Sequence, residues 1–144
     1  MDKRFWSFLS TMICVAGPAA TVELHHIEVR RGTEGLTSMP LVVANTGMAP
    51  ISCSAALAHW YSTVLAEIAP GTEATVPLWL DPKSGTITIL NDKEENMPVE
   101  ALYCGIAGRA YETRTVLVPD TPGSWTGTRK VACAADADRL RCGR

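Results

Sequence analysis

The chain has 144 residues, of which 47% are hydrophobic and 19% are charged, and its formal net charge at pH 7 is −2. A mildly acidic chain is poorly suited to bind nucleic acid or an anionic lipid surface as its main partner. The length is enough for a leader, one domain of roughly 100 residues and a tail. We therefore expect a single folded domain with no nucleic-acid partner.

The N-terminus has the order of a secretory signal peptide. Two basic residues, Lys3 and Arg4, precede an apolar run over residues 5–15, and small residues follow this run. This arrangement predicts cleavage after Ala19 or Ala20 and a periplasmic or secreted mature chain that is not inserted in a membrane. A retained anchor is the alternative, but the apolar run is shorter than the roughly 20 residues that span a bilayer.

Three parts are expected along the chain. They are a signal peptide at residues 1–20, a β-sandwich domain at residues 21–118, and a Pro/Gly-rich linker with a disulfide-looped tail at residues 119–144.

Within the expected domain, short β-prone segments alternate with turns. The segments lie at residues 21–31, 40–44, 49–62, 74–80, 86–90, 99–106 and 110–118. Frequent turns between short strands favour an antiparallel sandwich or barrel over a βαβ fold. The last clear strand ends at Val118, so we expect the core to end near that residue.

The segment at residues 49–62 is expected to be the centre of the core. Its alternation places Ile51, Cys53 and Leu57 on one face, which we take as the core face, and continues to His59 and Tyr61. A helix is the competing interpretation, because residues 54–66 are rich in alanine and leucine and contain no glycine or proline. The strand-like flanks favour a strand.

The four cysteines after the leader predict a disulfide framework, because an exported chain is oxidised. Cys133 and Cys142 are close in sequence and would close a small loop in the tail, which leaves Cys53 to pair with Cys104. The latter bond could join inward faces of two opposing sheets. Zinc is the alternative for these residues, but no C-x-x-C pair is present.

Three features resemble immunoglobulin-like or fibronectin-type β-sandwich modules of bacterial exported proteins. They are the Leu41-Val42-Val43 strand that runs into Asn45-Thr46-Gly47, the Ile68-Ala69-Pro70-Gly71 turn, and the spacing from Cys53 to Cys104. The chain departs from the antibody pattern, since Leu102 stands where a tyrosine is expected two residues before the second cysteine. The resemblance covers residues 21–118 and implies an all-β, antiparallel immunoglobulin-like sandwich that serves as an interaction module.

A periplasmic copper site is the alternative from another functional class. His25, His26 and His59 could bind copper together with the thioethers of Met39 and Met48, because imidazole and thioether ligands suit that metal. Their spacing matches no metal motif, and neighbouring residues on a strand point to opposite faces. Solvent exposure or a structural role is the competing interpretation for these histidines.

No serine near His59 lies in a G-x-S-x-G turn, so the sequence does not predict a serine nucleophile. Glu94 and Glu95 lie in an expected solvated loop and do not form an acid–base pair. Glu100 shares the parity of the expected core residues of its strand, so we expect it to form an ion pair with Arg109 or Arg114 or to lie at the wet end of the strand.

Aromatic residues are the stronger functional candidates. Trp60, Tyr61 and Trp79 are the candidate partner-binding residues, since exposed aromatic side chains on the outer faces of sheets are where a protein partner could dock. We therefore expect no enzymatic activity and no cofactor. The sequence predicts a non-enzymatic protein-binding module, acting as an accessory or assembly subunit of an envelope complex.

Overall fold

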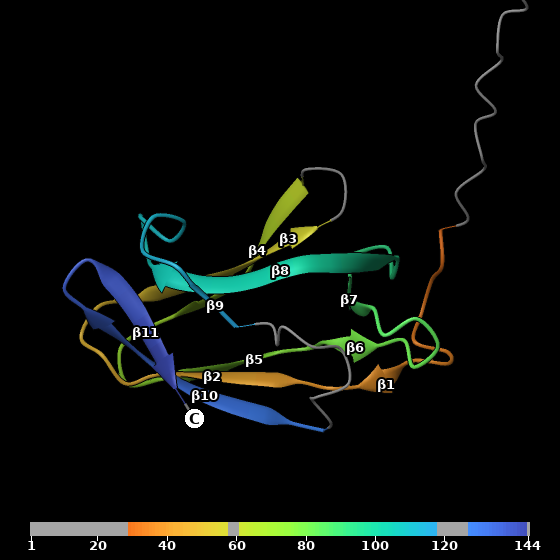
Figure 1. Ribbon diagram of the computed structural model, residues 1–144, viewed down its shortest axis with the longest axis horizontal. Helices are drawn as coiled ribbons and strands as arrows, with labels where there is room; N and C mark the ends of the chain where they lie inside the picture. Colours follow the sequence, from red (N-terminus) through yellow and green to blue (C-terminus); the bar gives the residue numbers. More distant parts are fainter. Residues whose placement is uncertain (1–28, 58–60, 118–126, 144) are drawn as a thin grey trace, which may run out of the picture.

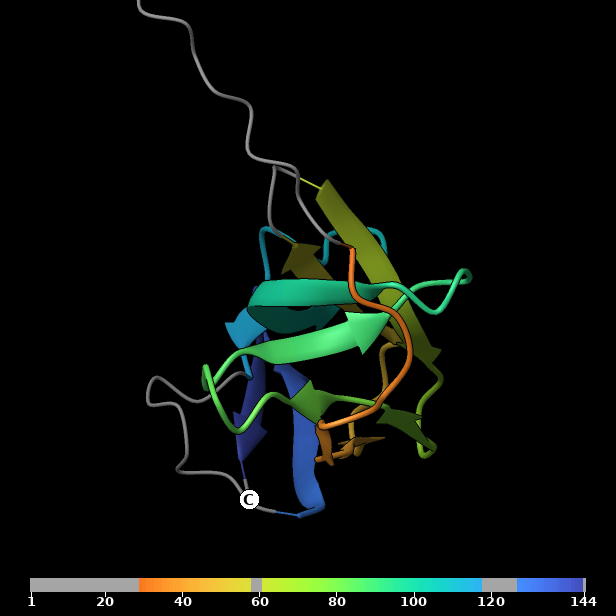
Figure 2. The same ribbon diagram turned by 90° about the vertical axis from the view of Figure 1, so that its right-hand side faces the viewer.

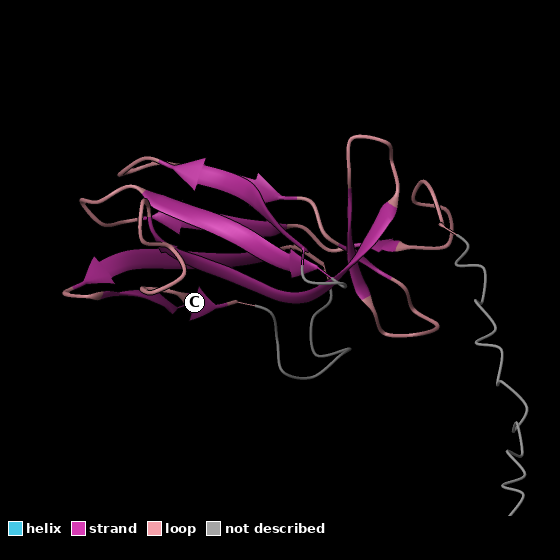
Figure 3. Ribbon diagram, turned by 90° about the horizontal axis from the view of Figure 1, so that it is seen from above, coloured by secondary structure: helices cyan, strands magenta, loops and turns pink. Residues whose placement is uncertain are grey.

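The computed structural model describes residues 29–57, 61–117 and 127–143, while residues 1–28, 58–60, 118–126 and 144 lie outside the described part. Within the described part every regular element is a β-strand, as Figure 3 shows. In chain order the strands are β1 (Thr37–Ser38), β2 (Leu41–Asn45), β3 (Ile51–Leu57), β4 (Tyr61–Ile68), β5 (Glu73–Val76), β6 (Trp79–Leu80), β7 (Ile87–Leu90), β8 (Asn96–Ile106), β9 (Thr115–Val116), β10 (Arg129–Asp136) and β11 (Arg139–Gly143). The expected all-β class is confirmed.

The strands form two sheets that lie face to face (Figure 1). The larger sheet has the order β1-β6-β7-β8-β3-β4, with β9 beside β8, and the smaller has the order β11-β10-β2-β5. The paired strands run antiparallel except β10 and β2, which run parallel. Fully buried apolar side chains from both sheets fill the space between them, among them Leu41, Val43, Val76, Ile51, Leu57 and Leu102.

The central strand β3 has the core face that its alternation predicts. Ile51, Cys53, Ala55 and Leu57 are at most 2% exposed. The strand nevertheless stops at Leu57, and the chain reverses so that β4 pairs antiparallel with it, with Leu57 opposite Tyr61. One continuous strand to residue 62 was therefore a wrong expectation, and so was a helix, because reversal lets Ile68 of β4 enter the same core as β3, with Leu65 packed against it.

Both predicted disulfides are present, but they lie within sheets. Cys53 and Cys104 are register partners on β3 and β8 with their Cα atoms 4.0 Å apart. Cys133 and Cys142 are register partners on β10 and β11 at 4.1 Å. The expected bond between opposing sheets is wrong, because β3 and β8 are neighbours in the same sheet.

The C-terminal segment is part of the fold and not a tail. β10 pairs with β2 over residues 129–133, and β11 pairs with β10. Val131, Cys133 and Leu140 are buried in the common core. The expectation that the core ends near Val118 is wrong because this pairing joins residues that are far apart in sequence, which local patterns do not reveal.

The last predicted domain strand, at residues 110–118, is reduced to β9. Residues 107–113 form turns, and the hydroxyl of Thr113 holds them by donating to the Arg109 carbonyl and accepting from the Ile106 amide. Glu100 is exposed and forms no ion pair with a described residue. A register shift places it in a bulge, since Leu57 pairs with Val99 and the preceding residue of β3 pairs with Ala101.

Candidate functional site

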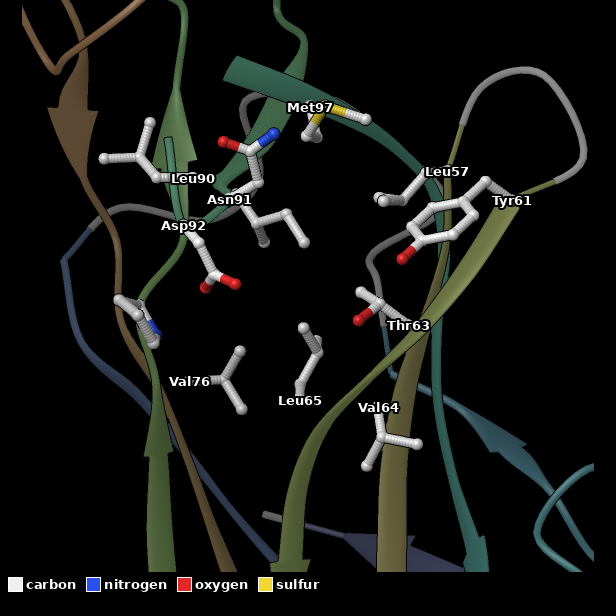
Figure 4. A pocket seen from close by; sticks show the side chains of 12 residues that line it. Leu57, Tyr61, Thr63, Val64, Leu65, Val76, Leu90, Asn91, Asp92 and Met97 are labelled. Atoms are coloured by element: carbon white, nitrogen blue, oxygen red, sulfur yellow. The ribbon is translucent and has the colours of Figure 1, made fainter. Parts of the chain in front are cut away.

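A pocket of about 440 Å³ lies on the side of the molecule where β4 and β5 are the edge strands of the two sheets (Figure 4). β4 pairs only with β3, and β5 pairs only with β2, among the described strands. The far side of the pocket is built from β7, the turn that follows it and the start of β8. The pocket therefore borders an edge strand that pairs with no other described strand on its outer side.

Apolar side chains make most of the lining. Leu57, Val76 and Ile89 are buried core residues that also border the pocket, and Leu65 and Met97 are half-buried. The lining is completed on its apolar side by Val64, Pro77 and Leu90. Such a lining suits an aliphatic or aromatic group.

A bulge in β4 places Leu65 at this site. Val64 pairs with Ser54 and Ala66 pairs with Cys53, so Leu65 is an extra residue with no partner on β3. A bulge bends the strand and changes the direction of side chains near it. Thr63, Val64 and Leu65 all line the pocket, and the bulge lies at the end of this run.

Three oxygen-bearing side chains face the space between these walls. Figure 4 shows the Asp92 carboxylate on one side and the hydroxyl groups of Tyr61 and Thr63 on the other. None of these three side chains forms a hydrogen bond or an ion pair with another described residue. They are therefore available to a bound group.

The turn that carries Asp92 is tightly held. The Asn91 side chain accepts hydrogen bonds from the amides of Lys93 and Glu95 at 2.9 Å, and it donates to the Glu95 carboxylate at 2.9 Å. Glu94 adopts a left-handed backbone with φ of 59°. The Asn91 side chain is occupied by hydrogen bonds within the turn. Asp92 is therefore the side chain of this turn that can interact with a group bound in the pocket.

An N-terminal segment fixes the same turn from outside. Figure 2 shows residues from Val29 onward, in orange, crossing the end of the sandwich. Arg31 forms a bridge and a 2.8 Å ion pair with Glu95. The hydrogen bond from the Asn91 side chain, followed by that from Arg31, lowers the pKa of Glu95 below its ordinary value.

A similar effect is seen in the turn between β6 and β7, which precedes this one in the chain. The backbone hydrogen bond from Lys83, together with those from Ser84 and the charge of Arg30, lowers the pKa of Asp81. Neither Asp81 nor Glu95 lines the pocket. Both carboxylates instead stabilise the turns beside it.

The predicted aromatic residues are not brought together as one site. Tyr61 is 59% exposed and lines the pocket, but Trp60 lies outside the described residues. Trp79 is half-buried on β6 between Ser38 and Thr88, and it does not line the pocket. Sequence reasoning missed Leu65 and Asp92, because neither the bulge nor the approach of the β7–β8 turn to β4 has a local signature.

The predicted copper ligands are also divided. His25, His26 and His59 lie outside the described residues. Met39 and Met48 lie beyond opposite ends of β2, the former 2% exposed in the core and the latter 93% exposed. Over the described ranges, no group of three or more histidine, cysteine or acidic side chains is placed to hold a metal ion.

A second surface lies on the outer face of the larger sheet. The register places Val64, Ser54, Tyr103 and Val116 in one row across β4, β3, β8 and β9. Tyr111 packs edge-on against Tyr103, with ring centroids 6.0 Å apart. Val64 and Val116 are 60% and 55% exposed, so the row presents apolar side chains at both margins.

In comparisons with known proteins, no family model, no curated protein and no solved structure matches the chain. The part of the chain that the structure describes contains no helix long and apolar enough to cross a bilayer.

Proposed function

We propose that this chain is an exported, non-enzymatic protein-binding module of the immunoglobulin-like type, and that it binds an extended segment of a partner protein along β4. The observation that carries the proposal is the combination of a strand edge that pairs with no other described strand and a pocket beside it whose lining residues are mostly apolar. A segment added to β4 would gain main-chain hydrogen bonds from the edge, and its alternate side chains would reach the pocket.

The composition of β4 supports this role. Proteins usually protect an exposed edge strand with proline, with several charges or by keeping the strand short. β4 has eight residues, contains no proline and carries one charged side chain, Glu67. A β-bulge is a further protective feature, and β4 has one at Leu65, but the residues on either side of this bulge have none of the other protective features and keep an edge that pairs with no other described strand.

Export supports the choice of partner. Two disulfides are typical of proteins that fold in an oxidising compartment. Together with the expected leader, they favour a partner in the bacterial envelope, and we propose that the chain is an accessory or assembly subunit of a complex there.

A pair of matched variants tests the role of β4. Val64 and Val116 are similarly exposed, but only Val64 lies on β4 and lines the pocket. We expect Val64→Arg to reduce the amount of partner retained from the native envelope by about tenfold or more, which corresponds to about 1.4 kcal/mol. Val116→Arg should leave it unchanged.

Partner retention at the wild-type level by both variants would overturn the proposal. An equal reduction in both would also overturn it, because it would assign binding to the outer face of the larger sheet. Circular dichroism of both variants would verify that each is folded.

A further inference from the structure

We propose that the pocket receives a basic side chain, lysine or arginine, from the segment that binds along β4. This inference rests on the proposed function and specifies the chemistry of the partner. It follows from the combination of a long apolar wall with a single charged group, Asp92, in the lining.

The charge of the pocket favours a cation. Asp92 is the one charged residue among those that line it, and it forms no ion pair with a described residue. Lys93 is its neighbour in sequence and also forms no ion pair within the described part. An anionic side chain entering here would meet the Asp92 carboxylate, while a cationic one would form a charge-assisted hydrogen bond with it.

The opposite wall supplies further acceptors. The hydroxyl groups of Tyr61 and Thr63 point into the same space as the Asp92 carboxylate (Figure 4). An ammonium or guanidinium group carries several N–H donors and needs several acceptors to replace its water. Oxygens from both sides of the pocket meet this need.

The apolar wall suits the stem of the same side chain. Leu65 and Val76 line the pocket together with Asp92 and Thr63, and lie below them in Figure 4. Lysine and arginine pack their methylene stems against apolar surface and keep the charged end in polar surroundings. A purely apolar side chain would fill the pocket but form no hydrogen bond with these three oxygens.

The experiment uses n-hexylamine as a probe for the basic side chain and n-hexanol as its neutral counterpart. Each is titrated into the isotope-labelled mature chain, and binding is followed by the amide shifts of Thr63, Asp92 and Met97. We expect the amine to bind about threefold or more tightly than the alcohol, a ratio typical of an exposed ion pair. Asp92→Asn should abolish the difference.

Asp138→Asn is the matched control, because Asp138 is an exposed aspartate in the turn between β10 and β11. It should keep the preference for the amine. Equal binding of the two probes, no shift at the pocket with either, or a preference that survives Asp92→Asn would overturn the inference. The comparison of Val64→Arg with Val116→Arg does not depend on these outcomes. The proposed binding along β4 and the proposed basic side chain can therefore be contradicted separately.

Discussion

Single residues decide how closely segments of this molecule approach one another. Asn45 is buried, and its side chain donates to the carbonyls of Ala49 and Ile68 and accepts from the amide of Gly47. The sequence Asn45-Thr46-Gly47 predicts a turn, and the turn is confirmed. A Cβ atom at this glycine would lie 3.2 Å from the backbone of Ala134, which is a tight contact.

Gly105 gives a sharper test of such packing. A Cβ atom at this position would overlap the backbone carbonyl of Ala110. We expect Gly105→Ala to lower the free energy of unfolding by about 1–3 kcal/mol, because backbone atoms cannot move aside as a flexible side chain can. Urea denaturation measures the change. Gly143→Ala is the control, since a Cβ atom at that position would meet open space, and an equal effect of the two substitutions would contradict the account.

Glu95 should make stability depend on pH. Its pKa is lowered in the folded state by hydrogen bonds from Asn91 and Arg31, so its contribution is present above the ordinary carboxyl pKa and fades as the pH falls through the lowered value. We expect the difference in unfolding free energy between wild type and Glu95→Gln to shrink on going from neutral pH to about pH 3.

Denaturant titrations at a series of pH values would follow that difference. Glu112→Gln is the matched control, because Glu112 is exposed and forms no ion pair with a described residue. If the difference in unfolding free energy between wild type and Glu95→Gln stays constant with pH, the role assigned to this carboxylate is contradicted.

Among the elements, β4 and the β10–β11 hairpin depart most from expectation. β4 is an edge strand with a bulge at Leu65, and that bulge shapes the pocket. The hairpin extends the smaller sheet by two strands. Both features arise from the pairing of strands, which residue patterns within one segment indicate only weakly.

The hairpin should be essential for folding. A chain that ends at residue 118 would lose the parallel partner of β2 and the buried side chains of Val131, Cys133 and Leu140. We expect it to lose cooperative thermal unfolding as followed by circular dichroism, whereas a chain lacking only Arg144 should melt as the full chain does. A cooperative transition in the shorter chain would restore the interpretation of residues 119–144 as a tail.

On the scale of the whole molecule, two disulfides each tie neighbouring strands, one in each sheet. The two sheets are joined by packing, by the connecting loops and by hydrogen bonds such as that from the Asn45 side chain on β2 to the Ile68 carbonyl on β4. Neither disulfide involves β4 or β5, and these two edge strands border the pocket through which we propose that the chain acts.

Export makes a prediction about the whole chain. Mass spectrometry of the protein from its native host should show a mature chain that begins at Ala20 or Thr21, if residues 1–20 are the signal peptide that the sequence predicts. Alkylation without reduction should modify none of the four remaining cysteines, because the structure pairs them all. An intact Met1 would instead indicate a retained anchor.

The sequence by itself determined the all-β class, the core face of β3 and both cysteine pairings. Each of these follows from a local pattern or from simple counting: alternation with period two, turn residues, and an even number of cysteines.

Only the tertiary structure decided that Cys53 and Cys104 are neighbours in one sheet, that β10 pairs with β2, and that Asp92 faces Thr63 across a pocket. These features depend on which strands become neighbours, and that choice is made by burying apolar area from segments far apart in the chain. For the same reason the pocket, and the basic side chain that we propose for it, could be inferred only from the folded molecule.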